Sequence, residues 1–332
     1  MAMAEDVYAS GRGLQLIVRI FGWCMLVTVP IYFFDNFLTF VLGWPGVLKI
    51  FDGQSANLNS VIQLCIYLAG IAFAVIYVMR TSGRHLRDEA ASITKFNTFL
   101  VRAAFWAVFL VGLTDMAISF LRVEGLLPYL VGDQLTSDLG RSQFRGPYVH
   151  IPLMVLSVLI AIRSKTLGFQ WLALLVVMAE LMIVITRFIF SYEQAFMGDL
   201  VRFWYAALFL FASAYTLVEE GHVRVDVFYA GFKTKTKGFV NAIGTLFLGI
   251  TLCWTILLVG MGNKAAIIYS PLANYEVTQS GFGMYVKYLM AGFLAVFAVT
   301  MLIQFVSYLM EAVADYFEQP GHHDHEPPIA AG

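Results

Sequence analysis

A set of charged side chains surrounds one apolar run in the second half of the chain. Asp199 and Arg202 lie one helical turn apart where this run begins. His222, Arg224 and Asp226 follow its end and alternate with valines. An extended chain would turn these three side chains to one side, and a helix would bring His222 and Asp226 together at i, i+4. The spacing predicts a compact polar cluster suited to a protein contact, with a turn in the membrane interface as the alternative.

The preceding apolar run carries two ionisable groups. Glu180 and Arg187 are seven residues apart, which places them on one helical face but ~10.5 Å apart along it, too far to pair directly. Arg187 is near the end of the run, where its side chain can extend to water. Glu180 is deeper, and we expect it to be buried against another helix or subunit because it needs a polar partner there. Asp115 and Arg122 repeat the spacing in an earlier run, where we expect them to anchor a helix end.

No catalytic pattern accompanies these residues. The chain has no phosphate-binding loop, no HExxH and no GxSxG. Cys24, Cys65 and Cys253 lie within apolar runs and lack CxxC spacing, so neither a disulfide framework nor a zinc site is expected. We therefore predict no enzymatic activity, no cofactor and no metal site.

A membrane anchor subunit of a haem or quinone redox complex is the alternative from a different class. His150 and His222 lie at helix ends, whereas haem ligation needs a pair of histidines at membrane depth. The histidines of the C-terminal segment are expected to be solvated rather than bound to metal. A Soret band in the purified protein would favour this alternative.

Composition determines the elements that must carry these residues. Hydrophobic residues make up 60% of the 332 residues and charged residues 13%, whereas soluble domains carry about 25% charged residues. The apolar residues recur in runs of about 20, the length that crosses a bilayer as a helix. The 21 basic and 22 acidic residues are dispersed, so no nucleic-acid surface is expected. The sequence predicts an all-α integral membrane protein in contact with lipid.

Eight apolar runs are bounded by charge, glycine or proline. They lie at roughly 14–42, 59–79, 97–121, 148–162, 167–190, 200–218, 239–261 and 284–310. With the N-terminus inside, eleven basic residues fall in inner loops and five in outer loops, so both termini are predicted to be cytoplasmic. The fourth run is short and could be re-entrant, but without it the cluster of Lys233, Lys235 and Lys237 would face outward.

Residues from about 167 to 312 resemble the DctQ-type small permease subunit of tripartite ATP-independent periplasmic (TRAP) transporters. In that family one helix ends in an Arg-aromatic pair. The next helix opens with two acidic residues and an Arg, and closes with small residues before a GGHIRVD-like sequence. The matching positions here are Arg187, Phe188, Asp199, Arg202, the stretch 212–215 and the segment 221–226. Gly198 and Val218 depart from the family pattern, at the first acidic position and at a position where a basic residue is common.

The resemblance implies a multi-pass subunit of the bacterial inner membrane that binds a large permease subunit, which carries the sodium and substrate sites. A periplasmic solute-binding protein would deliver the solute, often an organic acid, and this chain would act as scaffold and docking surface. The residues that we interpret as assembly candidates are Glu180, Arg187, Asp199, Arg202, His222, Arg224 and Asp226. The chain would then divide into an N-terminal membrane extension of about four helices (1–165), a DctQ-like four-helix domain (166–312) and a short polar cytoplasmic tail (313–332).

Overall fold

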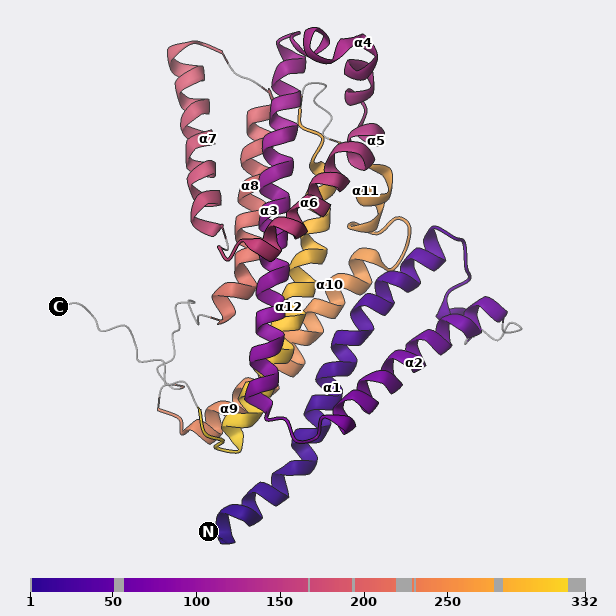
Figure 1. Cartoon of the computed structure of the whole chain (residues 1–332), viewed down its shortest axis with the longest axis vertical. Coiled ribbons are helices and arrows are strands. Elements are labelled where there is room, and N and C mark those ends of the chain that lie inside the picture. Colours follow the sequence, from indigo (N-terminus) through magenta and orange to yellow (C-terminus); the bar gives the residue numbers. More distant parts are fainter. Residues whose placement is uncertain are drawn as a thin grey trace, which may run out of the picture. The chain divides into compact units, whose positions relative to one another are not determined.

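The structure is a computed structural model that describes residues 2–50, 57–166, 168–192, 195–218, 229, 231–277 and 283–321. Within these ranges the chain is helical throughout, apart from short connections, and contains no strand. The long helices are α1 (Ala2–Phe40), α2 (Leu58–Arg80), α3 (Leu86–Val123), α7 (Phe169–Ile189), α8 (Ala195–Val218) and α12 (Lys287–Tyr316). The shorter segments are η1 (Val47–Ile50), α4 (Leu127–Leu139), α5 (Ser142–Arg145), η2 (Gly146–His150), α6 (Ile151–Arg163), α9 (Thr234–Gly244), η3 (Thr245–Ile250), α10 (Thr251–Met261) and α11 (Tyr269–Asn274) (Figure 1).

Eight helical stretches in the described part of the chain are long and apolar enough to cross a membrane, which confirms the predicted number and the all-α class. The fourth is longer than the sequence indicated, because α5, η2 and α6 form one continuous stretch over Ser142–Arg163. The third begins at Leu86 rather than near residue 97. Its first turns contain the charged residues that made this segment look like a loop.

The chain forms two compact units. Unit 1 comprises residues 1–94, 223–251 and 302–332, and unit 2 comprises residues 95–222 and 252–301. Each unit draws on both halves of the sequence, since α3 and α12 each contribute one part to unit 1 and the other part to unit 2.

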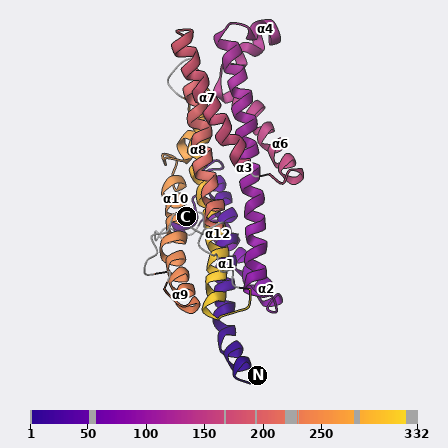
Figure 2. The ribbon, with the colours of Figure 1, turned by 90° about the vertical axis from the view of Figure 1, so that its left-hand side faces the viewer.

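Unit 1 is organised around the α1–α2 hairpin, the start of α3, α9 and the end of α12. Gly238 of α9 lets two backbones approach closely, because a Cβ there would lie 2.5 Å from the carbonyl oxygen of Ala312 and from the amide nitrogen of Tyr316. Both ribbon views show α9 beside the end of α12 (Figures 1 and 2). Arg87, near the start of α3, bonds Asp315 at 2.7 Å. The first turns of α3 and α9 and the last turns of α12 thus meet within this unit.

Unit 2 has an aromatic core where α3, α8 and α12 pack. The rings of Phe211 and Phe293 lie 4.9 Å apart, and those of Phe105 and Phe211 lie 5.7 Å apart. A glycine of α3, Gly112, makes room for Trp204, whose indole nitrogen would be 2.3 Å from a Cβ at that position. Helix α7 packs along α8 at the side of this core (Figure 2). The core fixes the helix ends that carry the polar residues described next.

Candidate functional site

A buried carboxylate lies at the centre of a polar network in unit 2. Asp115 of α3 has no exposed surface. Its Oδ1 accepts a hydrogen bond from Arg145 Nη1 at 2.7 Å and lies 3.1 Å from His150 Nε2. Its Oδ2 accepts the backbone N–H of Tyr285 at 2.8 Å. Both oxygens are therefore engaged, which offsets the cost of removing a charge from water.

Arg145 provides the compensating positive charge. Its side chain is fully buried, and it donates from Nε to the carbonyl oxygen of Leu139 at 2.6 Å and from Nη1 to Ser119 Oγ at 3.2 Å. The guanidinium carbon lies 4.3 Å from the centre of the Tyr285 ring, a cation–π contact. Arg145 stands where α5 passes into the π-helical turn η2, and such turns often occur where a helix must place a side chain specifically.

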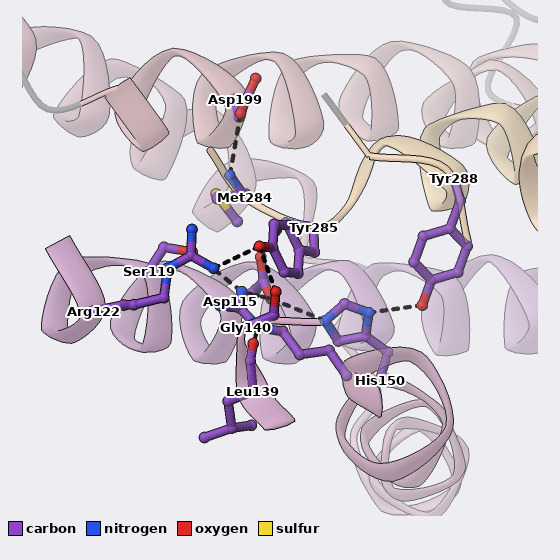
Figure 3. A network of polar contacts seen from close by, with 11 residues as sticks. Asp115, Ser119, Arg122, Leu139, Gly140, His150, Asp199, Met284, Tyr285 and Tyr288 are labelled. Atoms are coloured by element: carbon purple, nitrogen blue, oxygen red, sulfur yellow. Dashed lines mark hydrogen bonds and ion pairs between the residues drawn. The ribbon is translucent and has the colours of Figure 1, made fainter. Parts of the chain in front are cut away.

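His150 continues the network from the other end of η2. Its Nδ1 lies 2.7 Å from the hydroxyl of Tyr288, so the ring joins Asp115 on α3 to Tyr288 on α12 (Figure 3). His150 is fully buried and its ring stacks on that of Tyr288, with centroids 5.8 Å apart. The neighbouring Gly146 is required by the same packing, because a Cβ there would lie 2.2 Å from the ring of Tyr275.

Two aspartates hold the segment that leads into α12. Besides the bond from Tyr285 to Asp115, the backbone N–H of Met284 donates to Asp199 Oδ2 at 3.1 Å (Figure 3). The Tyr285 hydroxyl donates to the carbonyl oxygen of Gly140 at 2.8 Å and receives a 2.5 Å bond from Arg122. Negative charge near a helix N-terminus is favourable because the unpaired amides there carry partial positive charge. The network therefore fixes how the chain enters the last span.

This arrangement joins helices through buried polar side chains that bond one another. Asp115 binds both the guanidinium of Arg145 and the imidazole of His150, while Arg145 Nη2 is buried without a hydrogen-bond partner among the described residues. The described residues contain no group of three or more His, Cys, Asp or Glu side chains that could hold a metal ion. The network can link α3, the α5–η2 stretch, α8 and the start of α12, and resist their separation. We define it as the Asp115 network, made of Asp115, Ser119, Arg122, Arg145, His150, Asp199, Met284, Tyr285 and Tyr288.

One part of the chain matches a known protein family. Residues 173–314 match the family described as tripartite ATP-independent periplasmic transporters, DctQ component. Residues 173–314 are thus similar to the DctQ component of these transporters. DctQ proteins are small membrane subunits of TRAP transporters in the inner membrane, and the eight apolar helices of this chain agree with that place. No curated protein and no solved structure was found to match the chain.

The Asp115 network joins the DctQ segment to the preceding extension. Asp115, Arg145 and His150 precede residue 173, whereas Asp199 and the segment of Tyr285 and Tyr288 lie within the DctQ match. The extension therefore contributes buried charges to the same packed unit as the DctQ helices, rather than attaching only through a linker.

The structure separates the assembly candidates into three groups. Asp199 is 7% exposed and bonds Met284, and Arg202 Nη1 lies 3.9 Å from Asp199 Oδ1 with its side chain 70% exposed. Glu180 and Arg187 lie on α7 with exposed side chains. The remaining candidates, His222, Arg224 and Asp226, lie outside the described residues.

The expectation that Asp115 anchors a helix end was wrong, because Asp115 is fully buried and paired. Sequence reasoning also missed Arg145, His150 and Tyr285 as parts of one network. A signal was present: Asp115 and Arg145 are opposite charges at the edges of apolar runs, where unpaired charges are costly. The backbone donor at Tyr285 leaves no trace in the sequence.

Proposed function

We propose that this chain scaffolds the large permease subunit of a TRAP transporter and helps to dock the periplasmic binding protein during ion-gradient-driven uptake of an organic acid or a similar small solute. The DctQ match over residues 173–314 carries this proposal. It also favours transport over the redox alternative.

The internal bonding supports a scaffold role. A transporter that moves ions by itself needs polar groups at membrane depth that can release and rebind them. Two of the three deep carboxylates in the described part of unit 2, Asp115 and Asp199, instead bind a guanidinium and backbone amides, which keeps them occupied. The third, Glu180, is exposed. The two occupied carboxylates suit a rigid support for a moving partner.

The isolated chain is expected to move no solute. In proteoliposomes, the chain alone should give no sodium-driven uptake, whereas the chain together with its large subunit and binding protein should accumulate solute. The control is the large subunit with the binding protein but without this chain, which should be inactive or strongly impaired. Sodium-dependent uptake by the chain alone would refute the scaffold role.

We also propose that both termini face the cytoplasm. The positive-inside pattern places the first turns of α3 and α9 and the end of α12 on one side, and the contacts of Arg87 with Asp315 and of Gly238 with Ala312 bring these ends together in unit 1. Reporter fusions after Lys165 and after Lys237 should both report the cytoplasm. Opposite locations would mean that Ser142–Arg163 does not cross.

The exposed assembly candidates are proposed to contact partners directly, and Asp199 is proposed to act through the segment before α12 that it holds. For His222, Arg224 and Asp226 we propose an assembly contact at the cytoplasmic end of α8. An aspartate gains nothing from anionic lipid, so Asp226 is more readily explained by a basic partner than by headgroups.

A further inference from the structure

The carboxylate of Glu180 lies at a depth where lipid cannot satisfy it. It is 11 residues from the first residue of α7 and 9 from the last, or ~16 Å and ~13 Å along a helix that rises ~1.5 Å per residue. The helix is otherwise strongly apolar, and Arg187 near its end is its only other charged residue. A glutamate side chain in the middle of such a span is too short to reach the headgroups.

Nothing in the described part of the chain compensates this charge. Glu180 is exposed and forms no hydrogen bond or ion pair with any described residue. Its neighbours one turn away, Val177 and Val184, are 62% and 49% exposed and offer no polar atom. Asp115, another deep carboxylate of unit 2, is fully buried and paired. Glu180, in contrast, is exposed and has no partner among the described residues.

Helix α7 is also the least covered of the candidate spans. Only 11% of its most apolar stretch is buried within the chain, against 50% for that of α12. One side packs on α8, and large apolar side chains cover the rest of its surface: Trp171, Leu174, Val177, Met178, Leu181, Met182, Val184 and Phe188. A wide apolar surface with one central carboxylate is suited to a helix that brings an opposite charge.

We propose that the face of α7 around Glu180 binds a transmembrane helix of the large permease subunit that presents a basic side chain at mid-membrane depth. The inference rests on the proposed function, since it names the contact by which the subunits associate. A lysine, arginine or histidine would supply the donor and the charge that Glu180 lacks, and the apolar rim would exclude lipid. A second copy of this chain fits poorly, because α7 against α7 would bring two carboxylates together.

Three substitutions at one position test the charge. Glu180→Gln keeps the shape, Glu180→Leu is compatible with lipid, and Glu180→Lys reverses the sign. Polar contacts between membrane helices contribute roughly 0.6 to 2 kcal/mol, so the Gln and Leu variants should bind the large subunit about three- to thirtyfold more weakly, and the Lys variant more weakly still. Ile76→Leu, an apolar change at an exposed position of α2, outside the proposed contact, should leave binding unchanged.

The measurement is co-purification of the tagged chain with its large subunit, together with the thermal stability of the chain alone. Glu180→Leu should not lower the stability of the isolated chain, because no internal partner is lost, so weaker binding cannot be attributed to misfolding. If wild type co-purifies with the large subunit and Glu180→Leu does so equally well, the α7 contact is wrong while the proposed function stands. If wild type fails to co-purify, both fail. A photo-crosslinker at position 180 should capture the large subunit, and capture of a second copy would refute the assignment.

Discussion

Replacing Asp115 with alanine should lower the free energy of unfolding of the chain by about 3 to 5 kcal/mol, the cost of removing one partner from a buried ion pair. Arg145 would keep its charge in a site with no exposed surface, and His150 and the Tyr285 amide would lose their acceptor. Native membrane and soluble proteins alike have small net stabilities, so this loss should be visible as reduced yield and a lower midpoint of thermal unfolding in detergent.

Asp138→Ala is the matched control. Asp138 also pairs with an arginine, Arg141, but that arginine is 63% exposed, and exposed pairs contribute about 1 kcal/mol or less. A double variant sharpens the test. Asp115→Leu combined with Arg145→Met removes both charges, so it should be less destabilised than the sum of its single variants by about 0.5 to 3 kcal/mol. Strict additivity would show that the two groups do not interact.

The number and kind of helices could be predicted because each span is encoded locally. A run of about 20 apolar residues can be recognised as a transmembrane helix from its own residues, without knowing which helices pack against it. The boundary of α3 could not be predicted, because its early turns contain Glu89, whose charge is neutralised by Arg19, 70 positions earlier in the chain. An unpaired charged residue marks the end of a transmembrane helix, but a charged residue with a partner can lie within the helix. The partner becomes known only from the fold.

The Asp115 network was missed for a related reason. Its partners lie at positions 145, 150 and 285, and one of them is a backbone amide that any residue could provide. From their seven-residue spacing we expected Asp115 and Arg122 to anchor a helix end together. In the structure each has its own partner: Arg122 bonds Tyr285, and Asp115 bonds Arg145. For Glu180 the sequence predicted burial against another helix or subunit. Within this chain Glu180 stays exposed, which leaves a partner subunit as the place to look.

Unit 1 contains a second buried ion pair, and its loss should have the other large effect on stability. Arg19 of α1 and Glu89 of α3 are 3% and 1% exposed and bond each other. Glu89 Oε1 also accepts the indole N–H of Trp23 at 2.5 Å, and Arg19 Nη2 donates to Thr81 Oγ1 at 2.9 Å. The pair thus ties α1 to the start of α3, and the bond to Thr81 ties α1 to the turn that follows α2.

Glu89→Ala should destabilise the chain by about 3 to 5 kcal/mol, because Arg19 would stay buried with only a hydroxyl as partner. Asp88→Ala is a close control, since Asp88 precedes Glu89 directly, is exposed and belongs to the same first turns of α3. Its loss removes only a favourable interaction with the helix dipole, about 0.3 to 1 kcal/mol. Thermal unfolding of both variants in one detergent compares the two positions, and equal midpoints would mean that burial of the Arg19–Glu89 pair contributes nothing. Glu89→Gln refines the result: it can still accept from Trp23 but leaves the Arg19 charge unbalanced, so stability near that of Glu89→Ala would assign the loss to charge rather than to hydrogen bonding.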